Sequence, residues 1–467
     1  MKKFILSISC FFMAFTILSC AAGRDYYEAM KVPEERFYKG EYVDAARMLL
    51  PEVNKGGKDQ LLFMMECGLM LHTAGDYETS NKVLLPAGKL AQIIPISVSQ
   101  EVASFLTNDR NTNYRGEDFE KVLVHVYLGL NFLLMNKYEE ARVEFMAVNN
   151  ELAKIKSEDG TARYKQNIMA KYLTAITFEI VGELNKDDRD IEFAYIEYKQ
   201  IYDLEPNLAM VKDDLLRLSK RLGYDDEYND WRKKFGKAYN EKADSGELIT
   251  IFQAGRSAVK QSRGPLLKDP MMEPVIRITI NTGSVTAGVT AAAVLVTLKN
   301  AENPIPKFVK RSNRVSNVRV IAGGDSINTI KLEDVEKTAI QNLEDDYSRL
   351  YKRVAASIAT KAIASVAAGI AAKKLAEQNK QLGQFSGIIG TVVAAGTGAA
   401  LFSQMRPDLR CWHTLPANFQ LGRMTLKPGK YNVKFILSGA EGKIDEIEKE
   451  VEIKKGEKTL VNIRTLY

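Results

Sequence analysis

The chain has 467 residues, of which 46% are hydrophobic and 27% are charged, and its formal net charge is +6. A single hydrophobic core rarely grows to this size, so we expect two to four domains. The small net charge does not indicate nucleic-acid binding. The three histidines, His72, His125 and His413, have no metal-ligand spacing, so we expect no metal site and no cofactor.

Residues 1–19 have the layout of a secretory signal peptide. Two lysines precede an apolar run from Phe4 to Leu18, which is too short to span a bilayer comfortably. The run leads into Cys20 through the sequence Ile-Leu-Ser-Cys, which resembles the lipobox of bacterial lipoproteins. The resemblance implies cleavage before Cys20 and attachment of several acyl chains to it, which anchor a protein far more firmly than one chain. The alternative is an ordinary signal peptide with a chance cysteine at the cleavage site.

The residues after Cys20 bear on the destination of the protein. In many such lipoproteins of bacteria with two membranes, an aspartate at this point favours retention at the inner membrane. Ala21 and Ala22 stand here instead, so the resemblance implies an outer-membrane anchor facing the periplasm. Cys67 and Cys411 remain unmodified, and we expect two separately buried thiols because they fall in different predicted domains.

Residues 20–240 are expected to form a helical domain, because apolar residues recur at three- and four-residue steps. A Gly-acid-Tyr pattern begins at Gly40 and again at Gly75, 35 residues later. A period near 34 residues is typical of tetratricopeptide repeats, in which helix pairs stack into an α-solenoid. Asp187, Asp188 and Asp190 indicate a lengthened loop in a fourth copy. The marks of the third and fourth copies are Leu128, Gly129, Phe132, Asn136, Tyr138, Ala141 and Phe145, and then Ala194, Tyr198, Ile201 and Pro206.

The spacing between the second and third copies is longer than the repeat requires. About 27 residues are extra, from Ile94 to roughly Glu120. Insertions in repeat arrays often lie on the binding face, so we expect a partner-contact loop. A structural brace between the copies is the alternative. The candidate contact residues are Tyr114, Arg115, Gly116, Glu117, Phe119 and Glu120.

The second half of the chain mixes strands and helices, so the expected fold class is multidomain α + β. Residues 241–330 are expected to be rich in β-structure, with strands at 246–252, 274–279 and 315–321. Residues 331–405 indicate an Ala/Gly-rich helical hairpin. Residues 406–467 indicate a small antiparallel β module, with strands at 424–426, 430–437, 447–453 and 459–465.

Two uncharged segments, 284–298 and 381–405, allow two interpretations. The second segment has 25 residues, enough for a membrane span, and its glycines suit close helix packing. Alternatively, residues 354–371 pack against 388–401 in water through alanine and glycine faces. The shortage of Leu and Phe favours this soluble hairpin.

A motif near the C-terminus has the pattern R-x-W-x-T-L-P-A. Its residues are Arg410, Trp412, Thr414, Leu415, Pro416, Ala417, Gln420 and Arg423. They resemble the C-terminal motif of a family of uncharacterised bacterial lipoproteins with N-terminal tetratricopeptide-like repeats. The segment from Tyr114 to Glu120 and the Ala-rich helix with Arg353 and Lys361 add to this resemblance. It implies the architecture described above and a structural role for the motif, and it implies no activity.

Cys411 and His413 are the candidates for chemistry. On a strand, residues two apart share a face and could form a nucleophile–base pair. The sequence shows no orienting acid or oxyanion loop nearby, so packing around Trp412 is the favoured interpretation. The sequence also has no phosphate-binding loop, His-Glu-x-x-His motif or Gly-x-Ser-x-Gly elbow, so we do not expect an enzyme.

These observations favour a membrane-anchored lipoprotein that acts as a protein-interaction scaffold in the bacterial cell envelope. Its expected partners are the membrane, through the lipid on Cys20, and unknown envelope proteins. The alternative is a membrane-inserting envelope component that uses segments 284–298 and 381–405. A cell-envelope enzyme built on Cys411 and His413 is the third hypothesis.

Overall fold

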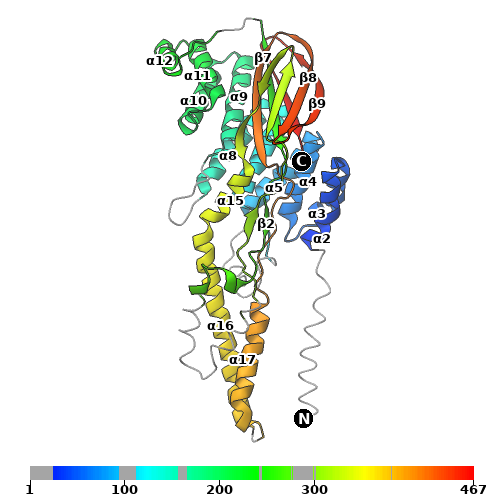
Figure 1. Ribbon diagram of the computed structural model, residues 1–467, viewed down its shortest axis with the longest axis vertical. Helices are drawn as coiled ribbons and strands as arrows, with labels where there is room; N and C mark the ends of the chain where they lie inside the picture. Colours follow the sequence, from blue (N-terminus) through cyan, green and yellow to red (C-terminus); the bar gives the residue numbers. More distant parts are fainter. Residues whose placement is uncertain are drawn as a thin grey trace.

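The computed structural model describes residues 25–93, 112–155, 166–240, 244–274, 276, 298, 301–379 and 381–467. The predicted signal peptide and Cys20 lie outside these residues, as do most of the predicted strand 274–279 and of the uncharged segment 284–298. The extra segment is described from Thr112 onward. Figure 1 shows a helical array beside a β unit, with a long helical hairpin that projects from one end of the molecule.

In the described residues, five pairs of antiparallel helices form the array, which confirms the tetratricopeptide-like α-solenoid. The fifth pair extends the array beyond the four copies marked in the sequence. The first and second helices of the pairs are, in order, α2 (Tyr26–Tyr38) and α3 (Tyr42–Lys55), α4 (Gln60–Thr73) and α5 (Tyr77–Ile93), α7 (Asp118–Leu134) and α8 (Tyr138–Lys154), α9 (Ile168–Asn185) and α10 (Asp188–Leu204), and α11 (Ala209–Arg221) and α12 (Asp225–Phe235).

Small residues let the two helices of a pair approach closely. A Cβ atom added to Gly129 of α7 would lie 2.6 Å from the ring of Phe145 on α8, and one added to Gly68 would lie 2.5 Å from Leu84. The turns between paired helices need a left-handed residue, with φ of 83° at Gly75 and 59° at Asn136. The repeated residues are therefore those that the close helix contacts and the tight turns require.

The lengthened loop predicted around Asp187 is wrong. α9 ends at Asn185 and α10 begins at Asp188, so two residues form the turn. Lys186 adopts the left-handed conformation, and the Asp187 carboxylate accepts a hydrogen bond from the backbone nitrogen of Arg189 at 3.0 Å. The acidic run is therefore an N-cap and a first helical turn, where carboxylates are favoured.

The described strands form two four-stranded sheets and one short ribbon. The inner sheet has the order β10-β1-β7-β6, the outer sheet has the order β5-β4-β8-β9, and β2 pairs with β3. The strands are β1 (Gly246–Ala254), β2 (Val259–Gln261), β3 (Lys307–Val309), β4 (Asn317–Ala322), β5 (Asp325–Asn328), β6 (Ile330–Asp334), β7 (Asn418–Leu426), β8 (Gly429–Gly439), β9 (Gly442–Ile453) and β10 (Lys458–Arg464).

The inner sheet is buried on both faces. On β1, Leu248 and Phe252 pack into the core between the two sheets. The alternate residues Ile249 and Ile251 belong to the core shared with the helical array. This double burial explains the nearly uninterrupted apolar run of β1, because a strand covered on one face alone would alternate with polar residues.

We expected residues 241–330 and residues 406–467 to form separate β regions, and the strand pairing corrects this expectation. β1 lies between β7 and β10, and β4 pairs with β8, so both segments build the same two sheets. β1 and β10 are parallel, so the C-terminal strands are not a self-contained antiparallel module. Alternation in a sequence predicts a strand and its faces but does not identify a distant partner strand.

The predicted helical hairpin is confirmed. After α15 (Val335–Asp345), α16 (Tyr347–Glu377) packs along α17 (Ser386–Phe402), with a short turn of 3-10 helix at Gly383–Phe385 between them. Leu332 to Asp334, which we expected to be helical, end β6 instead. Figure 1 shows the hairpin extending away from both the array and the β unit.

Candidate functional site

The inner sheet covers the face of the array that tetratricopeptide-like solenoids commonly offer to partners. The loop of residues 408–417, which carries most of the C-terminal motif, lies on the same face. Buried apolar residues from the array and the inner sheet form one core. Hydrogen bonds and ion pairs cross this contact from all five first helices, α2, α4, α7, α9 and α11. We name this contact region the inner-face junction.

Arg410 joins the motif to the beginning of the array. Its Nη1 lies 2.6 Å from Oδ1 of Asp59, just before α4, and its Nη2 lies 2.7 Å from Oδ2 of Asp408. The guanidinium also lies over the ring of Tyr114, with Cζ 5.4 Å from the ring centroid. Arg410 is 1% exposed, and losing one partner of a buried ion pair costs about 3–5 kcal/mol. The position therefore requires both carboxylates.

Glu120 ties α7 to the same motif. It is the N3 residue of a capping box, and its Oε2 accepts a hydrogen bond from the backbone nitrogen of Glu117 at 2.9 Å. The carboxyl group also accepts bonds from the backbone nitrogen of Trp412, at 2.7 Å, and from the hydroxyl of Tyr114. Burial and the nearby Glu117 raise the pKa of Glu120 to about 7. One buried carboxyl group thus links the start of α7 to Tyr114 in the loop before it and to the distant Trp412.

Glu66 plays a similar part in the middle of α4. Although it is fully buried, it accepts hydrogen bonds from the hydroxyl of Tyr26 at 2.9 Å and the backbone nitrogen of His413 at 2.6 Å. It also accepts bonds from the backbone nitrogen and the hydroxyl of Thr414, at 3.2 and 2.6 Å. Burial raises the pKa of Glu66 even though His413 and Thr414 oppose the shift. The glutamate therefore accepts hydrogen bonds from backbone N–H groups that have no strand or helix partner in this irregular loop.

His413 has an acidic neighbour that the sequence did not reveal. Glu34 of α2 lies 3.2 Å from its Nδ1. Burial opposes the charged ring, but Cys411 and Glu34 outweigh burial and raise the pKa of His413. Cys411 is 1% exposed, and the segment is a loop with a turn at His413 rather than the expected strand. A nucleophile must reach its substrate, so this burial favours packing over catalysis.

His72 of α4 lies between the array and two strands of the inner sheet. Its Nε2 accepts hydrogen bonds from the amide nitrogens of Gln253, at 2.8 Å, and Asn462, at 3.1 Å. Its Nδ1 donates to Oδ1 of Asn131 at 2.5 Å. Burial lowers the pKa of His72 to about 4 despite the bond to Asn131. The ring is therefore neutral at pH 7, with its proton on Nδ1.

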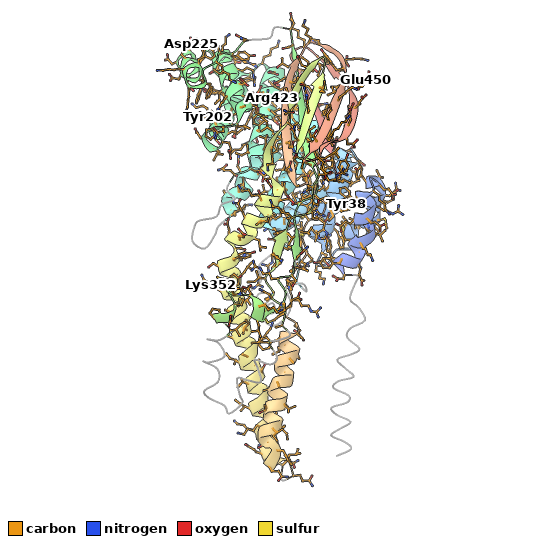
Figure 2. All side chains as sticks on the ribbon, viewed as in Figure 1. Tyr38, Tyr202, Asp225, Lys352, Arg423 and Glu450 are labelled. Atoms are coloured by element: carbon orange, nitrogen blue, oxygen red, sulfur yellow. The ribbon has the colours of Figure 1, made fainter. Side chains whose placement is uncertain are left out.

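A buried network of three cations and three acids holds the far end of the junction, around Arg423 (Figure 2). Arg423 of β7 contacts Asp214 through Nη1 and Glu247 through Nη2, both at 2.7 Å. Glu179 of α9 lies 2.8 Å from Arg217 and 3.2 Å from Lys458. The charge network is defined by Arg217, Arg423, Lys458, Glu179, Asp214 and Glu247.

The predicted partner-contact residues do not form a free surface. Tyr114, Phe119 and Glu120 are buried, and Arg115 and Gly116 are partly buried. Glu117 forms an ion pair with Lys260 of β2. The expectation that these residues contact a partner is therefore corrected, and residues 112–120 are a brace between the array and the C-terminal motif; the insertion before Thr112 lies outside the described residues. In that motif Arg410, Trp412, Thr414, Leu415, Pro416 and Gln420 are buried, and the side chain of Arg423 is 7% exposed.

The sequence analysis missed the acids of the inner face, Glu66, Glu179 and Asp214. Glu66 and Glu179 each stand within a helix that is otherwise dominated by apolar residues, α4 and α9. An isolated carboxylate in such a helix needs a buried cation or several donors. That pattern could have indicated a polar contact within the protein, although it would not have identified the partner.

Comparison with known proteins gives no match to a family model and no match to a curated protein. Among solved structures, the chain is similar to MamA from Desulfovibrio magneticus RS-1, with 16% identity, a TM-score of 0.31, and coverage of 46% of this chain and 94% of that chain. It is also similar to the kinesin light chain of Podosopora anserina with nearly identical TPR-like repeats, at 11% identity, a TM-score of 0.29, and coverage of 44% and 91%. The repeat assignment rests on the helix pairs of this chain itself.

Proposed function

We propose that the protein is a scaffold of the bacterial cell envelope that is anchored through the lipid on Cys20, faces the periplasm from the outer membrane, and binds other envelope proteins. The observation that carries this proposal is the inner-face junction. It joins a repeat array to a two-sheet β unit in one buried core, which gives a rigid body. Because the inner face is occupied within the chain, partners bind the outer surfaces of this body.

One outer surface has the character of a protein-binding patch. Val143 and Met146 on α8, and Phe193 and Ile196 on α10, are between 42% and 62% exposed. Residues three apart share a helix face, so each pair points the same way. An ion pair of 3.5 Å between Arg142 of α8 and Asp190 of α10 bridges the two helices. Clustered exposed apolar residues mark interaction sites. We name these four residues the outer patch.

Site-specific photocrosslinking in intact cells tests the outer patch. A photoreactive residue at position 193 is expected to give a defined adduct with another envelope protein, and Phe193→Glu is expected to weaken that association. The matched control is Val43 on α3, which is 50% exposed like Phe193 but lies outside the patch. Identical adducts from positions 43 and 193 would contradict binding at the patch.

The anchor has its own test. Metabolic labelling with a radioactive fatty acid is expected to label the full chain and to leave the Cys20→Ala variant unlabelled. Membrane fractionation then assigns the labelled protein to the outer or inner membrane. A labelled Cys20→Ala chain, or an unlabelled parent, would show that Cys20 is not the lipidated residue.

A further inference from the structure

The α16–α17 hairpin exposes apolar side chains to an unusual degree. Ile363 and Leu375 on α16, and Ile388 and Val392 on α17, are 64–69% exposed. α17 has no charged residue. The body covers only the base of the hairpin, where Val354, Ile358 and Phe402 join a small core. Figure 1 shows the rest of the hairpin clear of the array and of the β unit, so the described part of the chain leaves this surface uncovered.

The length of the uncharged region matches a bilayer. Residues 354–372 of α16 contain one charged residue, Lys361, and residues 383–402 contain none. At about 1.5 Å per residue these segments are roughly 28–30 Å long, and the hydrocarbon core of a bilayer is about 30 Å thick. This length includes the base, where Val354, Ile358 and Phe402 lie in the small core. Both helices are long and apolar enough to cross a membrane, and most of each apolar stretch is not buried within the protein. A core helix of a soluble protein would be mostly buried.

Charged residues stand at both ends of the uncharged region. Arg349, Lys352, Arg353 and Arg406 lie at the base, and Lys373, Lys374 and Glu377 lie near the turn. Lys352 is seen at the base in Figure 2. Charges at the two ends of an apolar hairpin can remain at the two water interfaces. Lys361 is 1% exposed, so it faces the protein rather than the outer surface of the hairpin, as charges within membrane segments do.

The seam between the helices has the packing used in membranes. Ser386, Gly390, Ala394, Gly398 and Phe402 recur every four residues and are the buried positions of α17, and the first four of them are small. A Cβ atom added to Gly369 of α16 would lie 2.6 Å from the carbonyl oxygen of Gly390. Small residues at this spacing allow helix backbones to approach closely in lipid, where no hydrophobic effect drives association. The same seam would also serve in water, so the exposed faces decide between the two environments.

We propose that the α16–α17 hairpin crosses the lipid bilayer to which the protein is anchored, with its base at one surface and the turn with Lys373 and Lys374 at the other. The sequence alone favoured a hairpin in water because Leu and Phe are scarce. The structure adds that the apolar faces point outward and that no described segment covers them.

The position of the hairpin agrees with the proposed anchor, on which this part of the inference rests. Figure 1 shows α2 at the end of the array nearer the hairpin and α12 at the far end. α2 begins at Tyr26, six residues after Cys20, so an extended connection would reach at most about 20 Å. The lipid on Cys20 would therefore attach at the end of the array nearer the hairpin.

Flotation separates the hairpin from the anchor. The Cys20→Ala chain, made without residues 1–19, purified in detergent and reconstituted with vesicles of phosphatidylethanolamine and phosphatidylglycerol, is expected to float with the vesicles after alkaline carbonate treatment. Ile363→Glu with Val392→Glu in the same background should lower the floated fraction about a hundredfold, because a charged residue at the centre of a membrane helix strongly opposes insertion. Val43→Glu is the control and should float like its parent. An unchanged urea midpoint would show that the body of the charged variant is folded.

The outcomes distinguish the two proposals. If the lipidated chain floats but the Cys20→Ala chain remains soluble, the anchor holds and the hairpin proposal is overturned. If the Cys20→Ala chain floats and the parent proves to be unlipidated, the hairpin proposal is supported and the anchor fails. If the Cys20→Ala chain is a detergent-free monomer that leaves the vesicles, the hairpin proposal is overturned.

Cysteine labelling shows whether lipid or a second copy of this chain covers the apolar surface of the hairpin. Val392→Cys and Lys430→Cys are made in the same Cys20→Ala chain without residues 1–19, whose remaining cysteines, Cys67 and Cys411, are buried. In vesicles, a membrane-impermeant maleimide should label position 392 at least about tenfold more slowly than position 430, because lipid excludes the reagent. Equal rates would overturn the proposal. Protection of position 392 without lipid, in an oligomer detected by light scattering, would identify a second copy as the occupant and also overturn it.

Discussion

Replacing Arg423 by methionine is expected to destabilise the protein by removing the central cation of the charge network. Asp214 and Glu247 each lose an ion pair of 2.7 Å, while Asp214 keeps Arg217 at 2.9 Å. Removal of one partner from a buried ion pair costs about 3–5 kcal/mol. Because the remaining cations still neutralise part of the acidic charge, the expected loss is about 3 kcal/mol.

The loss should depend on pH. Burial raises the pKa of Asp214 against the opposing effect of Arg423. For Glu247, Arg423 and Lys458 outweigh burial and lower the pKa. Without Arg423 both folded-state pKa values rise, so the folded variant holds protons that the unfolded chain releases as the pH increases. The deficit of the variant should therefore be larger at pH 8 than at pH 5.

Urea unfolding followed by circular dichroism and by tryptophan fluorescence measures the change. Arg319→Met is the matched control, because Arg319 lies exposed on the outer sheet and its guanidinium donates to Ser326. The control should change the unfolding free energy by less than about 0.5 kcal/mol. An Arg423→Met variant as stable as this control, or one with the same deficit at both pH values, would refute the reasoning.

Three further changes test other parts of the junction and the array. Burial raises the pKa of Glu333 to about 7, above its unfolded value, so Glu333→Gln should stabilise the chain at pH 8 by up to about 3 kcal/mol and hardly at all below pH 4.5 in urea unfolding. Burial lowers the pKa of His72 to about 4, so the parent loses stability as the pH falls from about 6.5 to 4, and His72→Gln should lose less over that range in thermal melts. Gly129→Ala should cost about 1–3 kcal/mol because its Cβ would meet Phe145, whereas Gly387→Ala, with open space around it, should gain up to about 1 kcal/mol. Equal effects of the two alanines on the melting temperature would contradict this packing argument.

Local features of the fold could be predicted because residues close together in the sequence determine them. The Gly-acid-Tyr pattern at Gly40 and Gly75 records a left-handed turn and a close helix contact, and both belong to one helix pair. β1 and β8 show their strand character through their own residues. The hairpin could be predicted for the same reason, because its helices are adjacent in the chain.

Contacts between distant segments could not be predicted in this way. Glu120 and Trp412 are 292 residues apart, and Arg410 and Asp59 are 351 apart. Within their own segments, Asp59, Glu120 and Arg410 look like surface or loop residues. Their burial follows from the docking of the inner sheet on the first helices, which no local periodicity encodes. The segment from Tyr114 to Glu120 was assigned to a partner surface because it is an insertion in the repeat spacing, whereas its partners Lys260 and Arg410 lie beyond residue 250 of the same chain.

The acids on the first helices also explain why the inner face is a permanent contact rather than an exchangeable binding groove. Glu66, Glu179 and Asp214 would each regain water if the β unit moved away, but Arg410, Arg423 and Lys458 would lose their partners at the same time. The same movement would expose Ile249, Ile251 and Trp412, which share the core with the array, so the loss of hydrophobic burial opposes it. An external ligand would have to replace the ion-pair partners and the apolar contacts at once. Binding at the outer patch or insertion of the hairpin requires neither, and both surfaces are exposed in the folded chain.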